Sequence, residues 1–130
     1  MATTGGTMSG ANVPTGSGSE RIKIIKQSAN YSAGSWSVLL DGVANHIYTI
    51  LSIIICNVDA TDRTCNLEVC DSDNSSNRTY LWNSQNVEGN GTFVWNDKFT
   101  VLGDDHIRFY GASSSTFSVY ISYIDQDWTT

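Results

Sequence analysis

Residues 47–58, IYTILSIIICNV, decide the fold of this chain. The stretch is built mainly of β-branched and aromatic residues and contains neither glycine nor proline, which is typical of a β-strand. Successive side chains of a strand point to opposite faces. One face would carry Ile47, Thr49, Leu51, Ile53 and Ile55, and the other Tyr48, Ile50, Ser52, Ile54 and Cys56. Because both faces are largely apolar, we expect a central strand, packed on a second sheet on one side and on more chain or another subunit on the other.

Shorter segments of the same character flank this stretch on both sides. They are residues 21–27, 35–40, 64–70, 79–83, 92–95, 98–102, 106–111 and 116–124. Turn-forming residues separate them, and none has a helical period. The short link at 59–62 predicts a hairpin of 47–58 with 64–70, and 106–111 is expected to pair back on 98–102. The number and spacing of the segments predict an all-β fold, an antiparallel β-sandwich of jelly-roll-like type.

Residues 1–19 differ in character from the rest. This stretch holds five glycines, the only proline and almost no apolar side chains. Such a segment cannot bury enough surface to offset its ordering entropy by itself. We therefore divide the chain into an extended Gly/Ser/Thr-rich arm, 1–19, and a β-sandwich domain, 20–130. The arm is expected to lie on a neighbouring subunit, with a flexible tail as the alternative. Its candidate partner contacts are Thr3, Thr4, Met8, Val13 and Pro14.

The charge and the cysteines limit the partners and the compartment. A net charge of −6 with seven dispersed basic residues argues against a nucleic-acid partner. The apolar stretch 47–58 is too short and too polar to cross a bilayer, so no membrane partner is expected, and no secretory signal is visible. Three cysteines, Cys56, Cys65 and Cys70, leave at least one thiol unpaired, which suits a reducing cytoplasm.

Few residues could carry chemistry. His46 and His106 are the two histidines, and no serine lies in a nucleophile-elbow pattern. Asp71 and Asp73 stand in an oxygen-rich stretch, but the glycine and the distant glutamate of a calcium loop are missing. We therefore expect no enzyme activity, no catalytic residues, no cofactor and no metal site.

Three aromatic residues are candidates for a contact surface. Tyr80, Trp82 and Trp95 lie near asparagines in the sequence. Exposed together on one face, they could stack on a sugar ring; packed against neighbouring strands, they would serve the core or a protein interface. The second use is the more frequent one, so we take these residues as candidate partner contacts.

The order of several motifs resembles a known class of proteins. Residues 47–49 (IYT), an apolar strand ending at 55–57 (ICN), residues 91–95 (GTFVW) and residues 101–109 (VLGDDHIRF) precede a closing strand. This arrangement, over residues 45–124, resembles the small β-sandwich virion structural proteins of tailed bacteriophages.

The resemblance implies a non-enzymatic virion protein, assembled in the host cytoplasm and present in many copies. Its leading form is a capsid decoration (cement) protein that binds the major capsid protein or other virion proteins and further copies of itself, a homo-oligomer. A tail, neck or fibre component is one alternative, and a carbohydrate-binding host-attachment module is another.

Overall fold

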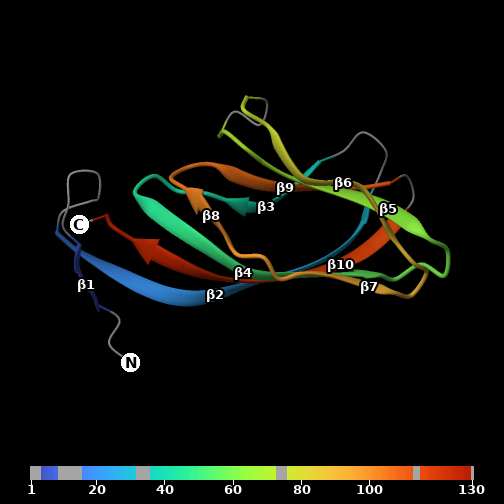
Figure 1. Ribbon diagram of the computed structural model, residues 1–130, viewed down its shortest axis with the longest axis horizontal. Coiled ribbons are helices and arrows are strands. Elements are labelled where there is room, and N and C mark those ends of the chain that lie inside the picture. Colours follow the sequence, from blue (N-terminus) through green and yellow to red (C-terminus); the bar gives the residue numbers. More distant parts are fainter. Residues whose placement is uncertain (1–3, 9–15, 32–35, 73–75, 113–114, 130) are drawn as a thin grey trace.

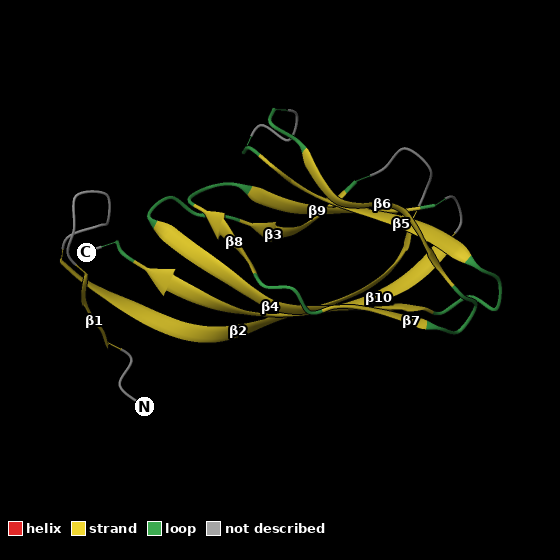
Figure 2. Ribbon diagram, in the orientation of Figure 1, coloured by secondary structure: helices red, strands yellow, loops and turns green. Residues whose placement is uncertain are grey.

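The computed structural model describes residues 4–8, 16–31, 36–72, 76–112 and 115–129, and for 4–8, 16–17 and 29–31 it describes the backbone alone. The regular structure of this part of the chain is entirely strand (Figure 2). The strands are β1 (Thr4–Met8), β2 (Gly16–Tyr31), β3 (Ser37–Asp41), β4 (His46–Asn57), β5 (Arg63–Cys70), β6 (Thr79–Val87), β7 (Thr92–Trp95), β8 (Phe99–Leu102), β9 (His106–Gly111) and β10 (Ser115–Asp127). They form two antiparallel sheets that pack face to face (Figure 1), which confirms the predicted antiparallel β-sandwich.

The pairing is that of one long hairpin rolled into a sandwich. From the tip outward, β5 pairs with β6, β4 with β7 and β8, β3 with β9, and β2 with β10. Rolling brings β10 beside β4 and β9 beside β5. The result is a six-stranded sheet in the order β1-β2-β10-β4-β7, with β8 also on β4, and a four-stranded sheet in the order β3-β9-β5-β6. If β7 and β8 are counted as one divided strand and β1 is set aside, each sheet has four strands. This arrangement is a jelly roll.

Two predicted pairings are wrong, because short links cross between the sheets where we expected hairpins. β4 does not pair with β5, and β9 pairs with β3 and β5 rather than with β8. At the first crossing the buried Asn57 donates its Nδ2 to the carbonyls of Thr61 and Val87 at 2.9 and 3.0 Å. At the second, Gly103 adopts a φ of 60° and donates its N–H to the carbonyl of His46. A turn-rich link fits a hairpin and a crossing equally well, so its composition did not distinguish them.

β4 is a central strand, as predicted, but its side chains do not alternate strictly. It lies between β10 and the β7/β8 pair. A β-bulge interrupts its register with β10, where Ser122↔Ser52 is followed by Tyr123↔Ile50. The extra residue, Leu51, exchanges the faces of the strand at that point. The buried members of β4 are therefore Tyr48, Ile50, Ile53, Ile55 and Asn57.

The core lies between the sheets. Its largest fully buried apolar side chains come from both layers, and they are Phe109, Phe117, Ile50, Ile53, Ile55, Leu67, Ile107 and Ile121. Phe109 and Phe117 meet edge to face with ring centroids 5.5 Å apart, which joins β9 to β10 across the sandwich. Because the core lies between the sheets, the opposite face of each sheet is available for other contacts.

The N-terminal region belongs in part to the six-stranded sheet. β2 begins at Gly16 and continues to Tyr31, so it extends beyond the predicted strand at both ends. Residues 4–8 form β1 and pair with the start of β2, with Met8 opposite Gly16. The bridging role of the arm stays a prediction. Its candidate contacts Thr3, Val13 and Pro14 lie outside the described residues, and for Thr4 and Met8 the backbone alone is described.

Candidate assembly surface

The six-stranded sheet has one face against the core and one face turned away from it (Figure 1). We call the second the outer face. The strand registers place on it Glu20, Ile22, Ile24, Lys26 and Ser28 of β2, Ser118, Tyr120, Ser122, Ile124 and Gln126 of β10, Ile47, Thr49, Ser52, Ile54 and Cys56 of β4, Thr92 and Val94 of β7 and Thr100 and Leu102 of β8. No described segment covers this face. The exposed fraction reaches 71% for Ile22 and 58% for Leu102, although both are large aliphatic residues.

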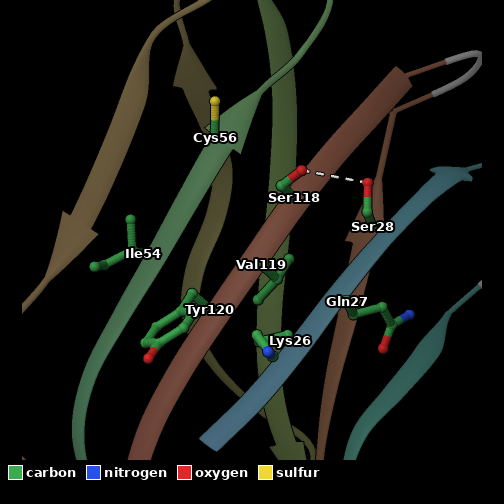
Figure 3. Close-up of a pocket in the computed structure, with 8 residues that line it drawn as sticks. All are labelled: Lys26, Gln27, Ser28, Ile54, Cys56, Ser118, Val119 and Tyr120. Carbon is green, nitrogen blue, oxygen red and sulfur yellow. Dashed lines mark hydrogen bonds between the residues drawn. The ribbon is translucent and has the colours of Figure 1, made fainter.

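A shallow hollow of about 370 Å³ lies on the outer face (Figure 3). Three adjacent strands line it through Lys26, Gln27 and Ser28, through Ser118, Val119 and Tyr120, and through Ile54 and Cys56. Lys26 is the one charged residue of the lining.

Pairs of serine hydroxyls occupy four of the polar positions of the same face. Ser28 and Ser118 place their Oγ atoms 3.3 Å apart, and Ser52 and Ser122 place theirs 3.0 Å apart. Because these hydroxyls can bind each other, the face can lose water at little cost to its polar groups. Such a surface suits contact with a protein better than chemistry on a small molecule.

The outward face of the four-stranded sheet carries a different arrangement, a cluster of charges and aromatic rings. Glu68 is fully buried and accepts hydrogen bonds from Arg108 Nε at 2.8 Å and Arg78 Nε at 2.9 Å. The ring of Trp36 lies over both guanidinium groups, 5.0 Å from Arg108 Cζ and 5.3 Å from Arg78 Cζ. The hydrogen bond to Glu68 raises the pKa of Arg78. The carboxylate is thus satisfied within the cluster, which covers this face of the sheet.

A second group of titratable residues joins three strands of the six-stranded sheet. Asp125 is buried and accepts hydrogen bonds from Lys23 Nζ and His46 Nδ1, both at 2.7 Å. The hydrogen bond with Asp125 is the main cause that raises the pKa of Lys23. The other histidine, His106, pairs with Asp41 at 2.8 Å in the other sheet. Each histidine therefore contacts a carboxylate at a strand end, and the two contacts lie in different sheets.

The three aromatic candidates do not share a face. Trp82 is 7% exposed and packs between the sheets, with its ring centroid 5.0 Å from that of Phe93 and 5.5 Å from that of Trp95. Tyr80 is exposed on the opposite side of the four-stranded sheet, 6.0 Å from the ring of Trp36. A sugar platform built from these side chains required all three on one surface, so the carbohydrate interpretation has no support from them.

The oxygen-rich stretch around Asp71 shows no metal site among its described residues. Over the described residues, no three His, Cys, Asp or Glu side chains are placed to share a metal ion. Asp71 accepts a hydrogen bond from Asn77 Nδ2 at 2.7 Å, and Asp73 lies outside the described residues. The described residues also contain no helix that is long and apolar enough to cross a membrane.

Comparison with known proteins shows the fold and no family. No protein-family model matches the chain, and no curated protein sequence does. A structure from work on Bacillus endospore appendages, which form disulfide-linked pili, aligns with a TM-score of 0.52 at 13% identity, over 91% of this chain and 96% of the other. A structure of infectious bursal disease virus, Gx strain, aligns with a TM-score of 0.51 at 8% identity, over 95% of this chain and 38% of the other. The chain therefore shares its sandwich with a pilus and a virus structure.

Proposed function

We propose that this chain is a non-enzymatic structural subunit of a virus particle, of the capsid decoration (cement) type. The outer face carries the proposal, because it exposes large aliphatic side chains that no described part of the chain covers: Ile22, Ile24, Ile54, Val94 and Leu102. Exposed apolar patches of this extent mark interaction sites in soluble proteins. The sandwich shared with a pilus and a virus structure supports a structural role.

The size of the outer face matches a protein interface. β10 has 13 residues, which at about 3.3 Å per residue spans roughly 43 Å. The strands β2, β10, β4 and β7/β8 lie about 4.8 Å apart, so they cover a width of roughly 19 Å. The product is on the order of 800 Å², close to the area that each partner contributes to a standard interface. We assign this surface to the shell protein on which the subunit sits.

The described titratable groups support a role without catalysis. His46 pairs with Asp125 and His106 with Asp41, so both histidines are engaged in contacts between strands. The buried Glu68 is likewise held between two arginines. These contacts join neighbouring strands within each sheet, and their side chains do not line the hollow of the outer face.

The copy number of the chain in purified virions tests the proposal. Quantitative mass spectrometry on whole particles, and on separated heads and tails, should find the chain in the heads at a fixed ratio to the major capsid protein. A signal confined to tails would replace the cement role by a tail, neck or fibre role. Absence from both fractions would refute a virion function.

A further inference from the structure

The outer face carries little charge for a chain of this composition. The chain has 13 acidic and 7 basic residues and a net charge of −6. Of the residues that the strand registers place on the outer face, the charged ones are Glu20 and Lys26, both exposed on β2. Their charges cancel, so the face as a whole is neutral. A second copy can approach through this face without the repulsion that a net negative charge causes elsewhere on the surface.

The two charges flank two exposed isoleucines in a symmetric order. Glu20, Ile22, Ile24 and Lys26 alternate along β2 and share the outer face. Ile22 is 71% and Ile24 51% exposed. The order along the strand is acidic, apolar, apolar, basic. When such a strand is reversed and laid on a copy of itself, each acidic residue meets a basic one and each isoleucine meets an isoleucine.

The other strands of the outer face follow the same symmetry. Two rows of side chains cross the face, one at the level of Glu20 and one at the level of Lys26. The first row is Glu20, Gln126, Ile47 and Leu102, and the second row is Lys26, Tyr120, Ile54 and Val94. Member by member, the rows pair an acid with a base, an amide with a phenol, and two aliphatic residues with two aliphatic residues. The complementarity therefore extends across the full width of the face.

A two-fold axis brings the rows together. If the axis lies along the face and crosses β2 at Lys23, it sets the outer face of a second copy against that of the first, with each strand antiparallel to its copy. Both rows lie three residues from Lys23 along β2, so each row faces the other row of the second copy. Packed sheets lie about 10 Å apart and within about 30° of each other, and the side chains of Glu20 and Lys26 span this separation.

The polar positions and the area of the outer face suit this contact. The hydroxyl pairs Ser28–Ser118 and Ser52–Ser122 form within one copy, so a second copy need not supply their partners. At on the order of 800 Å² from each copy, the contact buries about 1,600 Å² in total, which is the size of a standard specific interface.

We infer that the free chain forms a symmetric dimer in which the two outer faces cover each other. An interface of this kind is isologous and closes at two copies. A face covered by a second copy is not open to the shell protein, so the dimer is the form of the chain off the particle, and it separates when a subunit binds the head. The inference goes beyond the proposed function, because the dimer forms without a particle.

Charge reversal tests the symmetry of the dimer. Glu20→Lys and Lys26→Glu each set like charges opposite one another at two places in the interface. Each should weaken dimerisation in sedimentation velocity by about two- to thirtyfold, the range for two exposed ion pairs lost together. The double variant Glu20→Lys, Lys26→Glu restores a self-complementary order and should recover much of the loss. Glu88→Lys makes an equal charge change at an exposed loop position outside the outer face and should have no effect.

A mixture of the two single variants separates this dimer from other modes of association. Each variant supplies the charge that the other lacks, so the equimolar mixture should dimerise more strongly than either variant alone. No contact that keeps Glu20 and Lys26 apart predicts this recovery. Circular dichroism should show the same sandwich for every variant. A mixture no stronger than the single variants, a wild-type chain that stays monomeric, or wild-type assemblies that grow beyond the dimer would overturn the inference.

Particles separate the dimer from the proposed function. Virion heads that lack the chain, added in excess, should draw subunits from the dimer. Absence of the chain from virions would refute the proposed function and leave the dimer standing. A chain that is present on heads and monomeric in solution would refute the dimer and leave the proposed function standing.

Discussion

Removing two apolar side chains from the outer face should weaken particle binding and leave the sandwich intact. Ile22 and Ile24 are 71% and 51% exposed in the subunit. Fully burying an isoleucine side chain contributes about 1.5–3 kcal/mol, so the two residues together have about 2–3.5 kcal/mol still to gain on contact with the shell. The double variant Ile22→Thr, Ile24→Thr keeps the β-branched shape that strands favour. At about 1.4 kcal/mol per tenfold, it should bind heads roughly 30- to 300-fold more weakly.

The assay is co-sedimentation of the purified chain with virion heads that lack it. The matched control is Val43→Thr, Val58→Thr, which changes two half-exposed residues in loops away from the outer face. The control should bind like the wild type, and both variants should unfold within about 0.5 kcal/mol of it, as is usual for exposed positions. Equal head binding by the outer-face variant and the control would refute the assignment of this face.

Three further outcomes follow from the interior of the sandwich. Asn57→Ala should lower the free energy of unfolding in urea by about 2–4 kcal/mol, because the carbonyls of Thr61 and Val87 lose their buried donor; a cost below about 1 kcal/mol would show that water replaces it. In the native protein a maleimide should modify Cys56 and spare Cys65, because burial raises the pKa of the Cys65 thiol to about 11; modification of Cys65 at neutral pH would contradict its place in the core. The pKa of Lys23 is raised in the folded state, so the folded chain keeps a proton that the unfolded chain loses near pH 10.5. The contribution of Lys23 to the free energy of unfolding is therefore present at neutral pH and is lost as the pH rises above 10.5. Urea unfolding followed from neutral to alkaline pH should show a smaller decline for Asp125→Asn, and an unchanged decline would count against the Lys23–Asp125 contact.

The sequence predicted the class of fold through local pattern. The run of apolar residues on both faces of β4 required a central strand, and the structure has β4 between β10 and β7/β8. The bulge at Leu51 was not predictable, because it depends on the register with Ser122 and Tyr123, residues of a strand far away in the sequence. The crossings after Asn57 and Leu102 escaped prediction for the same reason. Their short links resemble hairpin turns, and the partners that hold them belong to other strands.

The candidate surface was predictable in part. A second apolar face on β4 indicated contact with more chain or another subunit, and Ile54 does lie on an uncovered face. That Ile22 and Leu102 share this face depends on the order of the strands, which no local pattern encodes. The cluster around Glu68 was missed, because this residue alternates in the sequence with Cys65, Leu67 and Val69, and such alternation predicts a solvent-facing side chain for the glutamate. In the structure Glu68 is buried beneath Arg78 and Arg108, and neither the spacing nor the composition of the sequence predicts such a contact.

The most direct test of a structural role through the outer face is a cryo-electron microscopy map of the intact virion, with this chain traced from its N-terminal strand. The account predicts subunits on the head in which Ile22, Ile24, Tyr120 and Leu102 are buried against the shell protein. Subunits on the head that turn these side chains to solvent, or particles without the chain, would contradict it.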